Sequence, residues 1–139
     1  MTERLCVDTS AWHRSTKPSI QEAWRDALEA DRVSICDQVK LEILYSARSA
    51  TDYDDLCLEL DALHHVPTTA ATFGRALEVQ AALARLGGLH HRSVKIADLL
   101  IAASAEAAGH IVWHYDEDFD RIAAVTRQRC EWIAPRGSL

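Results

Sequence analysis

The sequence lacks any apolar run close to the roughly 20 residues that a membrane-spanning helix requires. Its first ten residues, MTERLCVDTS, also lack the long apolar core of a signal peptide. These absences predict a cytoplasmic protein with no membrane partner. Hydrophobic residues make up 48% and charged residues 26% of the 139-residue chain, a balance typical of one globular domain rather than of a disordered segment.

The chain contains no C-x-x-C pair, although it has four cysteines. This spacing excludes the common zinc knuckles and dithiol redox motifs. In a reducing compartment, scattered cysteines are usually small buried side chains. We therefore interpret all four as structural thiols: Cys6, Cys36, Cys57 and Cys130.

A positive net charge is also missing. The chain has 15 Lys and Arg against 21 Asp and Glu, which gives a formal charge of −6. Proteins that bind nucleic acid by neutralising phosphates are usually basic, and the overall field of this protein repels a polyanion. A nucleic-acid function would therefore require local basic residues, a bound metal ion or a basic partner protein.

Short apolar runs alternate with helical patterns along the whole chain. The predicted strands are 5–7, 33–37, a brief strand and turn in 64–69, 110–114 and 130–135. The predicted helices are 17–32, 38–49, 51–63, 70–88, a helix in 90–110 and 116–126. Strands separated by helices predict a single α/β domain, residues 1–139, with a small, mainly parallel β-sheet between helices.

Several residues predict helix ends. Ser19 is the expected N-cap of the first long helix, and Thr51 with Asp54 forms a capping pattern for the third. Gly87–Gly88 and Gly109 are expected to end the two helices that precede them.

Two acids follow predicted strands directly. Asp8 comes after the first strand and Asp116 comes after HIVWH. In open α/β sheets, ligands bind beyond the carboxyl ends of the strands, so these two side chains could meet in space. They are our first candidate site residues.

Asp98 stands near the start of VKIADLLIAASAEAA, a segment that is apolar almost all round. A buried, ionised carboxylate costs several kcal/mol unless it is paired or coordinated. The alternative is an acid stabilised by the helix dipole, which is worth only about 0.3–1 kcal/mol. We favour a functional role for Asp98, whereas Glu42 in KLEILYSA would be structural if taken alone.

The run DEDFD, residues 116–120, matches the first ligands of an EF-hand calcium loop. Its sixth and twelfth positions hold Arg121 and Arg127, where that loop requires Gly and Glu, so a calcium loop is excluded. Asp118 could instead cap a helix, with Glu117 and Asp120 stabilising its positive end. Asp116 then remains as a candidate metal ligand.

Asp8, Glu42, Asp98 and Asp116 together give the sequence a likeness to a known family. The chain resembles the PIN-domain ribonucleases, specifically the VapC-type toxins of bacterial toxin–antitoxin pairs. The segments that carry the resemblance are VDTSAW, KLEILYSA, RSVKIADLLIAASAEAAG and VWHYDEDFDRIA. The last two are the most specific, with an Asp that opens a DLLIAA helix and a strand that ends in D-x-DF.

The resemblance implies a PIN-like fold and an Mg²⁺-dependent endoribonuclease that arrests growth by cutting tRNA, rRNA or mRNA. It implies that Asp8 and Asp98 bind Mg²⁺, with Mn²⁺ as a substitute, and that Glu42 and Asp116 complete an acidic quartet, Asp116 as a third metal ligand. Asp118 is an uncertain neighbour of this quartet. The family also implies a homodimer and inhibition by a cognate antitoxin.

Basic residues near these acids are candidates for contacts with RNA phosphates. Arg92 and Lys95 precede Asp98, and Arg14 and Lys17 follow Asp8. An ordinary solvated loop is the alternative for each of them. Among the tryptophans, Trp24 and Trp113 fit core positions, whereas Trp12 could face a partner or substrate.

Two other classes of function fit less well. A phospho-accepting receiver domain requires adjacent acids after the first strand, and an aspartyl phosphohydrolase requires D-x-D, but Asp8 is followed by Thr9 and Ser10. The main alternative is a catalytically silent PIN-fold module that only binds its antitoxin.

Overall fold

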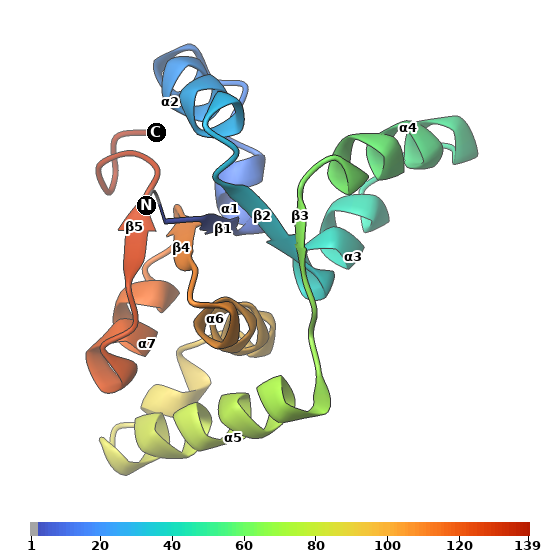
Figure 1. Ribbon diagram of the computed structural model, residues 1–139. Helices are drawn as coiled ribbons and strands as arrows, with labels where there is room; N and C mark the ends of the chain where they lie inside the picture. The colour runs from blue at the N-terminus through green and yellow to red at the C-terminus, as the bar shows by residue number, and fades with distance from the viewer. Residues whose placement is uncertain (1–2) are drawn as a thin grey trace.

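The computed structural model describes residues 3–139, which form one five-stranded sheet with helices on both sides (Figure 1). The strands are β1 (Leu5–Val7), β2 (Val33–Cys36), β3 (His64–Val66), β4 (Ile111–His114) and β5 (Cys130–Trp132). Their order is β3-β2-β1-β4-β5, and every neighbouring pair is parallel. The predicted α/β fold with a mainly parallel sheet is therefore confirmed.

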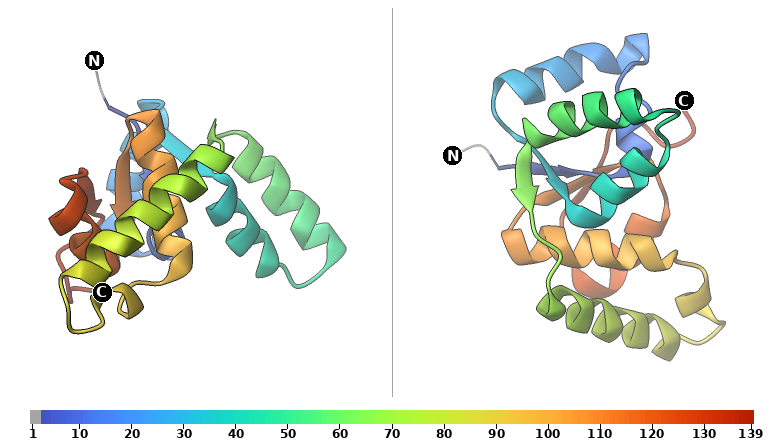
Figure 2. Two further views of the ribbon diagram at one scale, coloured as in Figure 1. Left: turned by 90° about the horizontal axis from the view of Figure 1, so that it is seen from below. Right: turned by 90° about the vertical axis from the view of Figure 1, so that its right-hand side faces the viewer.

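In the part of the chain that the structure describes, seven α-helices and one short 3-10 helix connect the strands. They are α1 (Thr9–Trp12), α2 (Pro18–Glu29), α3 (Asp37–Tyr45), α4 (Ala50–Asp61), α5 (Ala70–Arg85), η1 (His90–Arg92), α6 (Ile96–Ala108) and α7 (Asp118–Thr126). α2 lies on one side of the sheet and α5 and α6 lie on the other, while α3 and α4 project beyond the β3 edge (Figures 1 and 2). Within residues 3–139, no helix is both long and apolar enough to cross a membrane.

The core lies between the sheet and α6. Every residue of β1, β2 and β4 is buried, as expected for parallel strands covered on both faces. α6 is buried over all the residues from Asp98 to Ala105, which confirms the prediction of a buried helix. Ile101 of α6 and Phe119 and Ile122 of α7 are fully inaccessible to solvent.

The tryptophans pack on the α2 side of the sheet. The Trp24 ring stacks on Trp113 of β4 with their centroids 5.6 Å apart, and Trp12 meets Trp24 edge-on at 5.8 Å. The expected core position of Trp113 is thus confirmed, whereas Trp24 is half-buried and packs against the core from outside. Trp12 is half-buried against the same cluster.

The helix ends test the capping predictions. α2 begins at Pro18 with Lys17 as its N-cap, so the prediction for Ser19 is wrong; proline suits the first helical position, where its missing N–H costs nothing. α4 begins at Ala50, and its N-cap is Ser49, whose hydroxyl accepts the Asp52 N–H at 3.0 Å. The predicted Thr51 cap is therefore wrong by two residues. Gly109 ends α6 with a φ of 71°, as expected.

The four cysteines are free thiols. Cys6 and Cys36 are buried, whereas Cys57 and Cys130 are half-buried. Their interpretation as structural thiols agrees with these positions.

Because Ile101 is fully buried, Ile101→Ala should lower the free energy of unfolding by about 2–5 kcal/mol. The control is Leu58→Ala on α4, where the side chain is 74% exposed and the expected change is within about 0.5 kcal/mol. Urea unfolding followed by circular dichroism measures both. Equal losses in the two variants would contradict this account of the core.

Candidate metal centre

Four elements bring acidic side chains to the carboxyl edge of the sheet. Asp8 follows β1 and is the N-cap of α1, while Asp116 follows β4 two residues beyond the strand. Asp98 lies in the first turn of α6, and Asp118 opens α7. Since β1 and β4 are parallel neighbours, their ends deliver Asp8 and Asp116 to one place, as the sequence predicted.

Asp98, Asp116 and Asp118 form the tightest group of carboxylates. Each offers an oxygen that lies within 4.8 Å of the others. We call these three residues the aspartate trio. Asp98 and Asp118 are buried and Asp116 is half-buried, so the trio is largely withdrawn from water.

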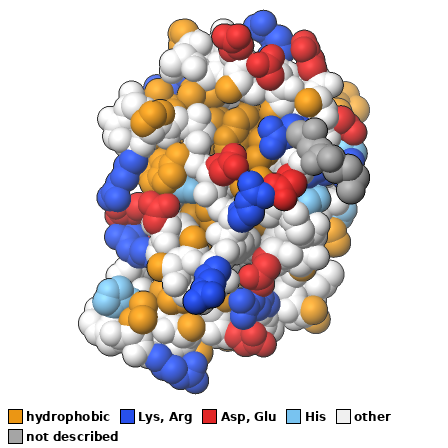
Figure 3. Space-filling model, turned by 60° about the vertical axis from the view of Figure 1, so that its left-hand side comes forward, with side chains coloured by type: hydrophobic (Ala, Val, Ile, Leu, Met, Phe, Trp, Pro, Cys, Tyr) orange, Lys and Arg blue, Asp and Glu red, His pale blue; other side chains and the backbone are white. Residues whose placement is uncertain are grey.

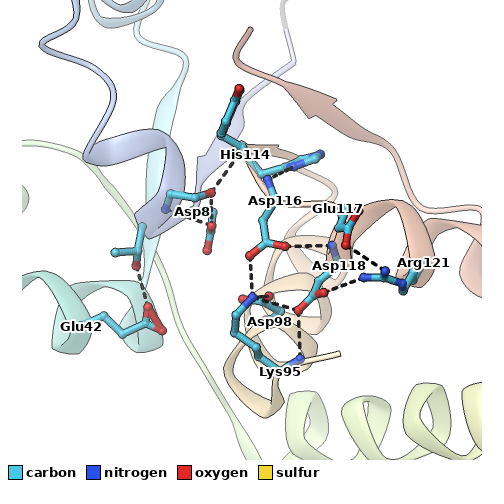
Figure 4. Close-up of polar contacts among 12 residues, drawn as sticks. Asp8, Glu42, Lys95, Asp98, His114, Asp116, Glu117, Asp118 and Arg121 are labelled. Atoms are coloured by element: carbon cyan, nitrogen blue, oxygen red, sulfur yellow. Dashed lines mark hydrogen bonds and ion pairs between the residues drawn. The ribbon is translucent and has the colours of Figure 1, made fainter. Parts of the chain in front are cut away.

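The sequence left two roles open for Asp118, a helix cap or a neighbour of the acidic quartet. The N-cap of α7 is Glu117, which makes no side-chain capping bond. The Asp118 carboxylate instead turns toward Asp98 and accepts the backbone N–H of Lys95 at 3.0 Å (Figure 4). Asp116 caps the turn, because its Oδ1 accepts the Asp118 N–H at 2.9 Å. Both acids of the D-x-D pair therefore face the site.

Asp8 and Glu42, the other two predicted acids, lie outside the trio and are held by different partners. The buried Asp8 carboxylate accepts the backbone N–H of Ser10 at 3.0 Å and a hydrogen bond from the Ser10 hydroxyl. Glu42 of α3 accepts the Thr9 hydroxyl at 2.6 Å (Figure 4). Thr9 and Ser10 therefore orient two of the four predicted acids.

Burial and mutual repulsion determine the protonation of these acids. Burial raises the pKa of Asp98 to about 8, and the charge of Asp8 contributes to this shift. Burial also raises the pKa of Asp8, although hydrogen bonds from Ser10 oppose it. Burial likewise acts to raise the pKa of Asp118, but the hydrogen bonds donated by Lys95 prevail and lower it.

The three predicted RNA-binding residues occupy different surroundings. Lys95 Nζ contacts the trio, at 2.6 Å from Asp116 and 3.1 Å from Asp118. The Arg14 guanidinium lies 4.3 Å from the ring centre of Tyr115, and its Nη1 donates to the Ser10 carbonyl at 2.8 Å. Arg92 is exposed in η1. These positions leave their role in RNA binding a prediction.

His114 of β4 supports the site through a hydrogen bond to a trio residue, a role that the sequence did not predict. Its ring is fully buried, 4.9 Å from the ring centres of Phe119 and Trp132, and burial lowers its pKa to about 4. Its Nδ1 accepts the Asp116 N–H at 3.1 Å, which fixes the backbone of a trio residue. A neutral ring is required for this bond, because only an unprotonated Nδ1 can accept it.

The donor set suits a hard divalent cation. Mg²⁺ and Mn²⁺ prefer carboxylate oxygens, and the trio supplies three of them without a histidine or cysteine ligand. Asp98 Oδ2 is buried and has no hydrogen-bond partner among the described residues. A buried carboxylate oxygen without a partner is costly, so a cation at this position would satisfy it.

Comparison with known proteins agrees with this arrangement. A family model described as PIN domain matches residues 5–125. The chain belongs to the PIN-domain family. Ribonuclease VapC18 of Mycobacterium tuberculosis is 63% identical over 135 residues, which cover 97% of this chain and 98% of that protein. Ribonuclease VapC51 of the same species is 41% identical over 139 residues, covering 100% of this chain and 99% of that protein. The resemblance to VapC-type proteins is confirmed.

Solved structures share the fold of this PIN domain at low sequence identity. DNA-bound VapBC from Salmonella typhimurium has a TM-score of 0.74 and 21% identity, with 96% of this chain and 100% of that chain covered. VapBC-1 from nontypeable Haemophilus influenzae has a TM-score of 0.72 and 16% identity, with 93% and 97% covered. The predicted PIN-like architecture is therefore confirmed.

In EDTA, Asp98→Asn is expected to melt a few degrees above the wild type at pH 8.5, and this difference should shrink toward pH 5. The folded-state pKa of Asp98, about 8, lies above the value near 4 of an unfolded chain. The folded protein therefore keeps a proton that the unfolded chain has lost, and wild-type stability falls as the pH rises from about 4 to about 8. The Asn variant lacks this loss.

Differential scanning fluorimetry across this pH range measures the effect. Asp26→Asn on α2, where the carboxylate is exposed, is the control and should show no such trend. A melting difference between Asp98→Asn and wild type that does not change with pH would contradict the protonation of Asp98.

Proposed function

We propose that this PIN domain is an Mg²⁺-dependent endoribonuclease, the toxin of a toxin–antitoxin pair, which cuts cytoplasmic tRNA, rRNA or mRNA. The observation that carries the proposal is the largely buried aspartate trio at the carboxyl edge of the sheet, in which Asp98 Oδ2 accepts no hydrogen bond from the described residues. It is supported by the relatives named ribonuclease, two of which match nearly the whole chain.

The acidic residues have two roles: the aspartates would hold the cation, and one further carboxylate would accept a proton from the attacking water. Asp98 and Asp116 of the trio, with Asp8 nearby, would hold Mg²⁺, and Asp118 would join them. When bound, the ion would supply a bound water of lowered pKa and neutralise charge on the scissile phosphate. Mn²⁺ offers the same preference for oxygen ligands.

Glu42 is the best placed general base. It is half-buried at the edge of the site, outside the trio. The Thr9 hydroxyl donates to Oε2, and Gln38 Nε2 lies 3.3 Å from Oε1, so the carboxylate is oriented yet keeps free lone pairs. A carboxylate so held can accept a proton from the attacking water, and the hydrolysis requires no covalent intermediate with the protein.

Substrate binding has to overcome a net charge of −6. On the face drawn in Figure 3, Lys and Arg side chains are interspersed with Asp and Glu rather than gathered into one basic patch. RNA would therefore be held locally, by Arg14, Arg92 and Lys95 around the acids and by the cation itself.

The decisive experiment is cleavage of a mixed pool of tRNA and rRNA by the antitoxin-free protein, in Mg²⁺ or EDTA. We expect discrete cuts in Mg²⁺ that disappear in EDTA, and a loss of at least ~100-fold in rate for Asp98→Asn, because one metal ligand is removed. Asp26→Asn, which removes a carboxylate from the exposed surface of α2, should cut as the wild type does.

Equal cutting in EDTA would contradict the metal-dependent mechanism. If the wild type neither cut RNA nor bound Mg²⁺ in calorimetry, the protein would instead be a PIN-fold module that only binds an antitoxin. Both readouts are needed, because a narrow RNA target could hide activity in a protein that binds the ion.

We further propose that the PIN domain forms a homodimer and binds a cognate antitoxin through a different surface. α5 and α6 border an apolar hollow lined by Phe73, Leu77 and Ile96, side chains that are 53–71% exposed. An exposed apolar surface of this kind can pair with the same surface of a second copy across a two-fold axis. Leu41 and Tyr45 of α3 are also exposed, which leaves α3 and α4 for the antitoxin.

Leu77→Asp is expected to convert the dimer into a monomer, because it places a charge in the apolar contact. Light scattering after size-exclusion chromatography measures the mass. Leu41→Asp is the matched control: its side chain is 67% exposed, compared with 66% for Leu77, and it should leave the dimer intact. A monomeric wild type, or a dimer that only Leu41→Asp disrupts, would contradict this assignment.

A further inference from the structure

The most unusual contact of the site is made by Lys95. Its ammonium reaches all three members of the aspartate trio, at 2.6 Å from Asp116 Oδ2, 3.1 Å from Asp118 Oδ2 and 3.5 Å from Asp98 Oδ2 (Figure 4). The last oxygen is the buried one without a hydrogen-bond partner. The positive charge of Lys95 thus lies where the three carboxylates converge.

Local backbone geometry holds Lys95 at this position. It is the N-cap of α6, three residues before Asp98, and its N–H donates to Asp118 at 3.0 Å. The Lys95 side chain is 64% exposed, so it reaches the trio from the solvent side. A fixed backbone and a long, flexible, exposed side chain allow the ammonium to leave without any change of fold.

An ammonium and a divalent cation cannot share this position. Mg²⁺ binds carboxylate oxygens at about 2.0–2.1 Å. A cation at that distance from the trio would fall within the van der Waals space of Lys95 Nζ, which already lies 2.6–3.5 Å from the same oxygens. Two positive charges so close would also repel strongly in a largely buried site.

We propose that Lys95 is a built-in counter-ion that competes with the divalent cation for the aspartate trio. The inference rests on the metal site of the proposed function and deepens it. Without the cation, the ammonium neutralises the repulsion among the trio and keeps the site folded. Binding of the cation displaces the ammonium to the rim of the site, where it is free to contact an RNA phosphate. Lys95 therefore sets the concentration of cation at which the nuclease becomes active.

The test is the affinity of the whole protein for Mn²⁺, measured by isothermal titration calorimetry without RNA. Lys95→Met keeps the length of the side chain but removes its charge, and it should bind Mn²⁺ about 10-fold more tightly than the wild type. Lys17→Met is the matched control, since Lys17 is an exposed lysine at the N-cap of α2. It removes the same charge from the molecule and should shift the affinity less than 2-fold.

A second measurement reports on the metal-free protein and does not depend on catalysis. In EDTA, Lys95→Met should melt below the wild type, and saturating Mn²⁺ should raise its melting temperature by more than it raises that of the wild type. Lys95→Arg keeps the positive charge and should bind Mn²⁺ as weakly as the wild type does. It shows whether a change in Mn²⁺ affinity arises from the lost charge or from altered packing.

The outcomes separate the two proposals. If Lys95→Met binds Mn²⁺ with wild-type or lower affinity, competition by Lys95 is wrong, although the metal site stands. If neither the wild type nor Lys95→Met binds Mn²⁺, the metal site of the proposed function is itself wrong.

Discussion

Repulsion among carboxylates is the constraint on which the rest of this structure depends. Asp8, Asp98, Asp116 and Asp118 come from four elements and converge at one edge of the sheet, three of them buried. Bringing like charges together out of water is unfavourable, since each buried charge loses its hydration and strengthens the field on the others. The fold therefore has to compensate the acids through fixed donors, altered protonation and a nearby cation.

Each form of compensation can be traced to particular residues. Ser10 donates twice to Asp8, which only partly offsets the effect of burial on its pKa. The backbone N–H of Lys95 donates to Asp118, whose pKa is lowered. Asp98 lacks such donors on its buried oxygen and has the pKa raised to about 8. The acid with the fewest partners is thus the one that most needs a cation, and this asymmetry identifies the centre of the site.

Much of the fold and part of the site could be predicted from the sequence. The strand ends placed Asp8 and Asp116 at the same edge because β1 and β4 are parallel, and parallel strands have their carboxyl ends at one edge of the sheet. Asp98 stood out because a charge in an apolar helix has few explanations. The role of Asp118 stayed open between a helix cap and a neighbour of the quartet, because the direction of its side chain depends on the entry angle of α7. The sequence placed His114 in a strand. Its packing against Phe119 and its hydrogen bond to the Asp116 N–H are visible only in the folded structure.

The position of Lys95 also bears on how an acidic protein could act on RNA. Without a metal ion, the Lys95 ammonium forms ion pairs with the trio, so little positive charge remains for contact with a phosphate. Under this proposal, a divalent cation would add two positive charges to the site and move the Lys95 ammonium from the trio to the rim. The site would then attract RNA only after it has bound the cation needed for cleavage. The replacement of the ammonium by the cation would supply both the reactive ion and a lysine free to contact a phosphate. A net charge of −6 is compatible with RNA cleavage on these terms, since the attraction is confined to the loaded site.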